Sequence, residues 1–259
     1  MKTIPVIYSF ARSGGTLVNQ LLGVHPDCLV LSEVNPAGSV VPVAMQAADW
    51  LGFVETTEVG RFQELPYSQQ IALLDARAKS KGKTLIIRDW VTVNYLPGAG
   101  GSTMGPSYIL EQSVYLARAG YSLQPLVLTR KAKSVYWSIR RNFMHMVNLT
   151  VEEFALSYLA YANAVSSFHR ISLESLQSAP RETLIQLLQV IGVSIDYVDM
   201  QLKTFADFRQ CTGNNTLTVP SATSYERHIV QVSQDSVGSI DTLNAEVLIE
   251  ADRLMGYEL

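Results

Sequence analysis

The chain of 259 residues carries 20 Lys and Arg against 23 Asp and Glu, a net charge of −3, and 47% of its residues are hydrophobic. This composition supports a sizeable core but lacks the basic surface that binding of nucleic acid or a sulfated polysaccharide requires, so a small-molecule or peptide partner fits better. No apolar run is long enough to cross a membrane, and Arg12 interrupts the only stretch that could act as a signal peptide. Only two cysteines occur, which is typical of a reduced, intracellular protein. Together these features predict a cytoplasmic protein.

The first predicted elements are a buried strand over residues 4–8, a turn, and a helix over residues 16–22. The turn and the first helical positions comprise Arg12, Ser13, Gly14, Gly15, Thr16 and Leu17, which include two glycines, two hydroxyls and one cation. A helix N-terminus offers unpaired N–H groups and partial positive charge, and glycine lets an anion approach the backbone closely. We therefore expect an anion-binding loop here. An ordinary strand–turn–helix is the alternative.

The loop departs from two common phosphate-binding patterns. If Gly14 is the second glycine of the nucleoside-triphosphatase pattern G-x-x-x-x-G-K-[ST], Ser9 replaces its first glycine and Gly15 replaces its lysine. The dinucleotide pattern G-x-G-x-x-G is also absent. The loop therefore favours neither a metal–triphosphate nor a dinucleotide.

Charged residues follow the next two predicted strands. The strands are expected over residues 28–31 and 83–89, with helices over residues 38–53 and 66–80 between them. Glu33 follows the first of these strands, and Arg88 and Asp89 end the second. Ligands of open α/β sheets bind beyond the strand ends, so these side chains are candidates for the site. An exposed loop acid is the alternative interpretation of Glu33.

Residues 90–106 form a predicted loop that contains four glycines. Loops this long inside a compact domain are usually binding loops or lids, and disorder is the alternative. Trp90 and Tyr95 indicate some packing. Together with Glu33 and Asp89, they are our candidates for contacting a substrate around the mouth of the site.

The second half of the chain continues to alternate strands and helices. Helices are predicted over residues 107–119, up to 142, from 150 to about 168, from about 180 to 192, over 195–208 and over 241–255, and strands over 124–129 and 171–173. Thr150 and Glu153 match a capping box, whereas residues 210–239 are polar and lack a period. This alternation predicts one α/β domain over residues 1–259, with a mostly parallel sheet of about five strands covered on both faces.

The loop from Arg12 to Leu17 resembles the loop that holds the 5′-phosphosulfate in sulfotransferases that use 3′-phosphoadenosine 5′-phosphosulfate (PAPS). Arg130 ends a predicted strand and Ser138 follows eight residues later, which is similar to the pair that binds the PAPS 3′-phosphate in that superfamily. A basic, exposed helix start is the alternative. The resemblance implies a three-layer fold like that of P-loop nucleoside triphosphatases, with PAPS as donor, adenosine 3′,5′-bisphosphate (PAP) as product, and no metal.

Further stretches extend this resemblance over the chain. Residues 23–33 are similar to a segment of tyrosylprotein sulfotransferases, in which Glu33 matches the glutamate that acts as base. Arg88 matches a lysine that stabilises the transferring group, and Arg227 lies in a looser match that adds it to the nucleotide-binding set. The resemblance therefore implies that Glu33, Arg12 and Arg88 are catalytic.

The sequence also departs from the family pattern. Ala11 replaces the usual proline, Gly15 replaces the first threonine of the loop, and Leu173 replaces a tyrosine that contacts the cofactor. No histidine lies between His25 and His145, so the loop after the third strand cannot supply the histidine base of many cytosolic members. We expect the four histidines to be structural or surface residues.

The sequence thus predicts transfer of a sulfuryl group from PAPS to a hydroxyl or amine of a small molecule by in-line displacement. The candidate acceptor residues suit a cationic or aromatic molecule, and a guanidinium alkaloid from secondary metabolism is one example. No nucleic-acid or membrane partner is expected, and the oligomeric state stays open. Two alternatives also stay open: a kinase of related fold, which the missing loop lysine disfavours, and a nucleotide-binding module without turnover.

Overall fold

The computed structural model describes residues 2–101, 105–142, 148–213 and 240–258. Its strands form a sheet in the order β3-β2-β4-β1-β5-β6. The strands are β1 (Lys2–Ser9), β2 (Cys28–Asn35), β3 (Gly38–Ser39), β4 (Thr84–Asp89), β5 (Tyr121–Thr129) and β6 (His169–Ser172). All neighbouring pairs are parallel except β2 and β3. The predicted mostly parallel sheet is confirmed, and the two-residue β3 is an addition to it.

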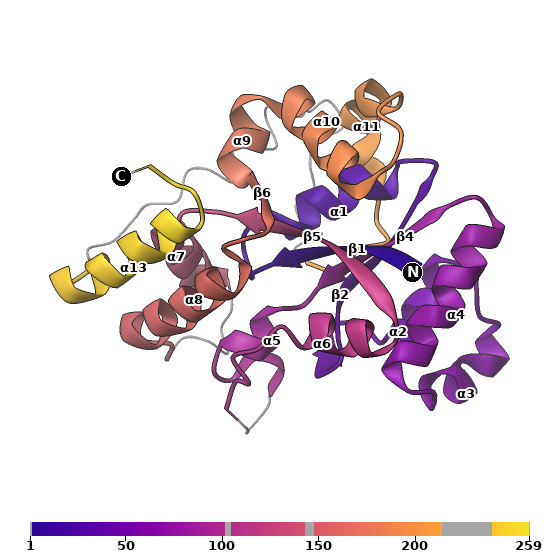
Figure 1. Cartoon of the computed structure of the whole chain (residues 1–259), viewed down its shortest axis with the longest axis horizontal. Coiled ribbons are helices and arrows are strands. Elements are labelled where there is room, and N and C mark those ends of the chain that lie inside the picture. The colour runs from indigo at the N-terminus through magenta and orange to yellow at the C-terminus, as the bar shows by residue number, and fades with distance from the viewer. Residues whose placement is uncertain (1, 102–104, 143–147, 214–239, 259) are drawn as a thin grey trace.

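Helices cover both faces of the sheet (Figure 1). One core lies under α1 (Gly15–Gly23), α9 (Leu173–Ser178), α10 (Pro180–Ile191), α11 (Val198–Thr204) and the 3₁₀ turn η5 (Phe205–Asp207). The other core lies under α2 (Val43–Met45), η1 (Gln46–Trp50), α3 (Val59–Gln63), α4 (Tyr67–Ser80), α5 (Thr92–Tyr95), η3 (Ala99–Gly101), α6 (Glu111–Arg118), α7 (Ala132–Asn142), α8 (Val151–Val165) and α13 (Thr242–Leu254). The short turn η2 (Thr56–Glu58) buries no residue. Within the described ranges, no helix is long and apolar enough to cross a membrane.

The apolar run in β1 is continuous because both of its faces are buried. Val6 and Tyr8 point into the core beneath α6 and α8, whereas Ile7 points into the core beneath α1 and α10. Such runs are typical of central parallel strands. In the sheet register Tyr8 lies opposite Asp89 of β4 and Val127 of β5, so the carboxyl ends of these strands meet at one edge.

Several local signals in the sequence are confirmed. The Thr150 hydroxyl accepts a hydrogen bond from the Glu153 N–H at 3.1 Å, and the Glu153 carboxylate accepts from the Thr150 N–H at 3.0 Å, which completes the capping box of α8. Pro180 stands at the first turn of α10, and Gly192 ends that helix at φ 73°. Both cysteines, Cys28 and Cys211, are buried.

Other predicted elements were wrong in type or extent. Residues 38–53 do not form one helix, because Gly38 and Ser39 pair with β2 and the helical turns begin only after the extended Pro42. The helix expected over residues 107–119 starts at Glu111, since Tyr108 adopts φ 54°, which is incompatible with a right-handed helix. The predicted loop 90–106 contains α5 and η3, and the segment after β6 forms the unpredicted α9.

Candidate active site

The loop between β1 and α1 has the geometry of an anion-binding turn. Arg12 adopts φ 70° and Gly14 adopts φ 89°, and these left-handed residues turn the chain into α1. The first helical hydrogen bond runs from the Val18 N–H to the Gly14 carbonyl at 3.1 Å. The N–H groups before it lie at the positive end of a nine-residue helix. The Leu17 side chain is in the core, so Leu17 can offer a ligand only its backbone.

The two predicted halves of the nucleotide site lie in direct contact. The Arg12 Nε donates to the Ser138 Oγ at 2.9 Å, and the Arg130 Nη1 donates to the Arg12 carbonyl at 3.1 Å. The Arg130 carbonyl in turn accepts from the Tyr158 hydroxyl at 2.9 Å. Arg130 and Ser138 are both buried, whereas Arg12 is partly exposed. The structure therefore joins the β1–α1 loop, the end of β5 and helix α7 at one place.

Arg88 reaches the same loop from β4. A Cβ atom built on Gly15 would lie 2.5 Å from the Arg88 Nη1 and 3.0 Å from the Ser9 Oγ, so the guanidinium lies directly against the first turn of α1. Arg88 Nη2 is also 3.4 Å from the Glu33 Oε2. Arg88 is 2% exposed and the Glu33 side chain is 20% exposed, so the pair forms one wall of the site with the carboxylate on its accessible side.

Glu33 occupies a β-bulge. The register between β2 and β4 shifts between Ser32 and Val34, and Glu33 itself adopts φ 51°. The buried Gln46 side chain supports this irregularity, because it accepts from the Ser32 N–H at 2.7 Å and donates to the Ser32 carbonyl at 2.8 Å. Bulges re-aim side chains next to active sites. The unusual backbone of Glu33 thus directs its carboxylate towards Arg88.

Asp89 lies on the opposite face of β4 and is completely buried. Its Oδ1 accepts from the Asn35 Nδ2 at 2.8 Å, and the same amide donates to the Asn94 Oδ1 at 2.7 Å. Burial raises the pKa of the Asp89 carboxyl to about 8. The expected position at the mouth of the site is therefore wrong for Asp89, which ties β2, β4 and α5 together from inside.

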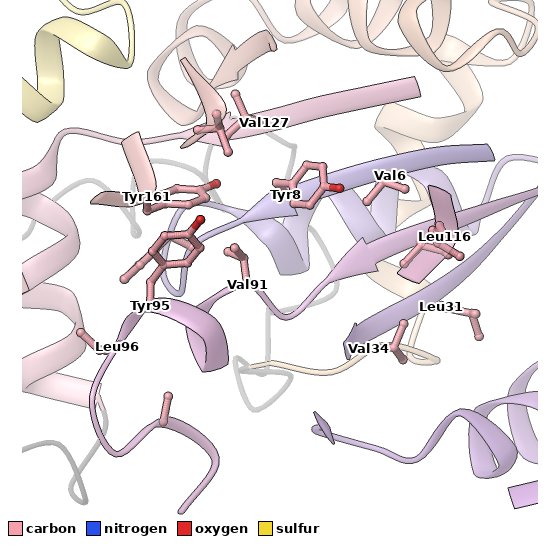
Figure 2. Packing of buried hydrophobic residues seen from close by; sticks show 14 of the residues in the cluster. Val6, Tyr8, Leu31, Val34, Val91, Tyr95, Leu96, Leu116, Val127 and Tyr161 are labelled. Carbon is pink, nitrogen blue, oxygen red and sulfur yellow. The ribbon is translucent and has the colours of Figure 1, made fainter. Parts of the chain in front are cut away.

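Tyr95 also lies in the core instead of at the mouth (Figure 2). Its ring centroid is 5.5 Å from that of Tyr161 and 6.2 Å from that of Tyr108, and the side chain has no exposed area. The helix α5 causes this placement, because it turns Tyr95 inwards from the segment that the sequence predicted as a loop. Trp90 alone of the predicted aromatic contacts is partly exposed, with its ring against Gly38 and Gly100.

Arg227 and the four histidines are the remaining residues that the sequence analysis discussed, and the structure describes only two of them. Arg227, His145 and His228 lie outside the described residues. His25 is a structural residue, as expected, because its Nδ1 accepts from the Asp27 N–H at 3.1 Å and its Nε2 contacts the Ser194 carbonyl at 2.8 Å. His169 lies exposed on β6.

Two residues of the site were missed by sequence reasoning. Arg88 Nη2 donates to the Ser32 Oγ at 2.7 Å and to the Thr212 Oγ1 at 2.6 Å. No motif marks either hydroxyl, and Thr212 lies in a polar stretch without periodicity.

In the described part of the chain, no group of three or more His, Cys, Asp or Glu side chains could hold a metal ion.

Comparison with known proteins gives matches in structure but not in sequence. No protein-family model and no curated protein sequence matches the chain. The sulfotransferase domain from the Synechococcus PCC 7002 olefin synthase matches with a TM-score of 0.55 and 16% identity, over 100% of this chain and 96% of that one. The sulfotransferase domain from the curacin biosynthetic pathway matches with a TM-score of 0.63 and 16% identity, over 100% of this chain and 99% of that one. The chain therefore has the fold of these sulfotransferase domains, which confirms the fold predicted from its sequence.

Proposed function

We propose that the chain is a PAPS-dependent sulfotransferase that acts on a hydroxyl or amine of a small molecule. One observation carries the proposal: Arg12, Arg130 and Ser138, which were selected from two separate stretches, form one hydrogen-bonded junction at the N-terminus of α1. The shared fold with sulfotransferase domains supports the same assignment.

The residues present fit the donor. The amides at the start of α1 suit the 5′-phosphosulfate, and Arg12 and Arg88 add two cations beside them. Both loop positions favour glycine, since Gly14 adopts φ 89°, where an L side chain is strained, and a Cβ on Gly15 would lie 2.5 Å from the Arg88 Nη1. Arg130 and Ser138 would hold the 3′-phosphate, the group that distinguishes PAPS from simple adenosine phosphosulfate.

The chemistry needs a base and a means of offsetting charge. PAPS supplies a sulfuryl group on a phosphate leaving group. In our proposal, Glu33 takes the proton from the acceptor as the new O–S or N–S bond forms and the S–O bond to phosphate breaks, so that the electron pair leaves with PAP. Arg12 and Arg88 offset the negative charge that develops on the sulfuryl and bridging oxygens.

The same geometry disfavours a kinase. A nucleoside-triphosphatase loop would place lysine at position 15, but even a Cβ there would lie 2.5 Å from the Arg88 Nη1. A lysine could fit only if the buried guanidinium of Arg88 moved away. A nucleotide-binding module without turnover would use the same loop, and only an activity measurement separates it from an enzyme.

The direct test is to incubate the purified protein with PAPS and a metabolite mixture that includes amines, guanidines and phenols, and to detect added sulfo groups by mass spectrometry. We expect sulfated product and PAP to form together. A parallel reaction with ATP and magnesium is the control for the kinase alternative. Phosphorylated product in that control would overturn the proposal, and tight PAP binding without transfer to any acceptor would favour the binding module.

A further inference from the structure

We propose that Ser32 and Thr212 are positioning residues that hold the Arg88 guanidinium against the first turn of α1, and that position 15 is glycine because of this arrangement. The inference rests on the proposed function, because the orientation of Arg88 matters only if a negatively charged group is transferred there. It assigns a role in the reaction to residues that do not touch the reacting atoms themselves.

Several polar contacts hold the Arg88 Nη2 in place. Besides its bonds to the two hydroxyls, Arg88 Nη2 lies 3.4 Å from the Thr212 carbonyl. The two hydroxyls also bind each other at 2.8 Å, and the Ser32 Oγ accepts from the Thr212 N–H at 3.0 Å. Ser32 is fully buried and Thr212 nearly so, so water cannot replace these partners freely. We call this set of Ser32, Thr212 and Arg88 the arginine clamp.

The clamp draws on three separate parts of the chain. Ser32 comes from β2, Arg88 from β4, and Thr212 from the segment after η5. That segment follows α1 closely, since the Gln20 Nε2 donates to the Phe208 carbonyl at 3.3 Å and the Thr16 Oγ1 donates to the Thr212 carbonyl at 3.2 Å. Thr212 is thereby fixed to the same helix whose N-terminus the guanidinium faces.

The clamp and Glu33 act on the same nitrogen of the guanidinium. The Arg88 Nη2 donates to both clamp hydroxyls and also lies 3.4 Å from the Glu33 Oε2, while the Nη1 lies beside Gly15. The two hydrogens of Nη2 are therefore directed at the hydroxyls and not at the carboxylate. An unclamped guanidinium would move towards the carboxylate, because the attraction between unlike charges is the stronger remaining interaction. It would then neutralise the proposed base instead of facing the transferring group.

Gly15 is the second half of the arrangement. The Arg88 Nη1 would lie 2.5 Å from a Cβ at position 15, and the clamp prevents the guanidinium from yielding. An ammonium is a compact point charge, whereas a guanidinium is a broad planar fork. The chain combines the larger cation with the smallest residue facing it, and we infer that Arg88 and Gly15 compensate each other in size.

The first experiment measures the affinities of PAPS and PAP by calorimetry without acceptor, because the two ligands differ only in the sulfuryl group. We expect Thr212→Val to reduce the preference for PAPS over PAP by about tenfold, because the variant loses one hydrogen bond to a charged group. The affinity for PAP should stay nearly unchanged. Thr212→Ser, which restores the hydroxyl, should recover most of the preference. Thr204→Val is the matched control, because the contacts of its hydroxyl in the described structure lie within α11, to the Met200 carbonyl at 2.9 Å and the Met200 Sδ at 3.3 Å.

The second experiment is a double-mutant cycle between positions 15 and 88. In the parent protein, Gly15→Ala should lower both the preference for PAPS over PAP and the melting temperature. In an Arg88→Lys background the same substitution should lower both quantities much less. Additive effects would overturn the compensation between Gly15 and Arg88. If Thr212→Val does not fold, Ser32→Ala tests the same clamp from β2.

The outcomes separate this inference from the proposed function. A parent protein that prefers PAPS over PAP, with a Thr212→Val variant that shows the same preference, would overturn the clamp and leave the function intact. A parent protein that binds neither nucleotide would overturn the function first.

Discussion

Arg12 and Ser138 lie 126 positions apart in the sequence, yet the Arg12 Nε donates a hydrogen bond of 2.9 Å to the Ser138 Oγ. The sheet explains this contact, because β1 and β5 are parallel neighbours in which Ser9 lies opposite Leu128. The loop after β1 and the helix after β5 therefore start from adjacent strand ends. Two patterns that are individually weak in the sequence thus describe one place in the structure.

Arg130→Ala should weaken PAP binding by roughly 10–150-fold, because a hydrogen bond between charged groups is worth about 1.5–3 kcal/mol. The loss should be confined to nucleotides with a 3′-phosphate, so AMP binding should change little. Calorimetry with both nucleotides measures the difference. Arg130 also bonds to the Arg12 carbonyl at 3.1 Å, so an equal loss for PAP and AMP would mean that Arg130 only supports the loop.

Arg12→Ala should lower turnover more than it lowers PAP affinity. Charge develops on the bridging oxygen in the transition state, and a cation placed there stabilises that state more than the bound product. Single-turnover rates and PAP calorimetry give the two quantities. Ser138→Ala is a useful companion, since it removes the partner of the Arg12 Nε but leaves the cation in place. A fall in affinity alone would restrict Arg12 to binding.

The sequence predicted those parts of the fold that depend on local patterns. The apolar run of β1, the capping box at Thr150 and the proline and glycine that bound α10 are short-range signals, and each is found where expected. The alternation of strands and helices then limits the topology, because parallel strands require crossover connections. This was enough to bring Arg12, Arg130 and Ser138 to one edge of the sheet.

The remaining features depend on contacts between distant segments. The bulge at Glu33 is supported by Gln46, whose side-chain amide bonds the Ser32 N–H and carbonyl as a neighbouring strand would. No periodicity in the sequence predicts this contact. Thr212 reaches Arg88 across 124 positions from an irregular segment. Tyr95 looked accessible because its segment resembled a loop, but α5 turns its ring into the core against Tyr161 and Tyr108.

Tyr95→Phe should leave both turnover and acceptor KM unchanged, because Tyr95 lies in the core. Its hydroxyl is buried and has no hydrogen-bond partner among the described residues, so its removal should leave stability equal or raise it by up to about 1–2 kcal/mol. Denaturant unfolding measures the change. Tyr158→Phe is the matched control and should be destabilising, since it removes the bond to the Arg130 carbonyl. A several-fold rise in acceptor KM for Tyr95→Phe would return Tyr95 to the acceptor site.

Asp89→Asn should change how stability depends on pH. Burial raises the pKa of Asp89 to about 8 in the folded chain, whereas an unfolded aspartate has a pKa of about 3.9. Between these two pH values Asp89 stays protonated in the folded state but loses its proton in the unfolded chain, which stabilises the unfolded chain. The free energy of unfolding that depends on Asp89 is therefore fully present below about pH 4 and is lost as the pH rises towards about 8. Asparagine does not titrate, so the variant should gain stability relative to the parent across this range. If the free energy of unfolding changed with pH in the same way for the two proteins between pH 5 and pH 8, the raised pKa of Asp89 would be contradicted.

Glu33→Gln is the sharpest test of the mechanism. Glutamine keeps the size of the side chain and its place beside Arg88, but it cannot take a proton from the acceptor. General-base catalysis contributes about 10²–10⁴ in rate, so turnover should fall at least about a hundredfold.

The alternative role for Glu33 is to hold geometry, either by pairing with Arg88 or by binding an acceptor cation. PAP affinity and melting temperature address the first possibility, because both should stay close to the parent if only proton transfer is lost. Acceptor KM addresses the second, since loss of a cation partner would raise KM as well as lower the rate. Single-turnover rates with excess enzyme isolate the chemical step. A variant within about threefold of the parent in that rate would remove Glu33 from the chemistry, since even modest general-base catalysis exceeds this factor. Glu33 would then serve the bulge and the Arg88 pair alone, and the proton would have to leave the acceptor without help from β2.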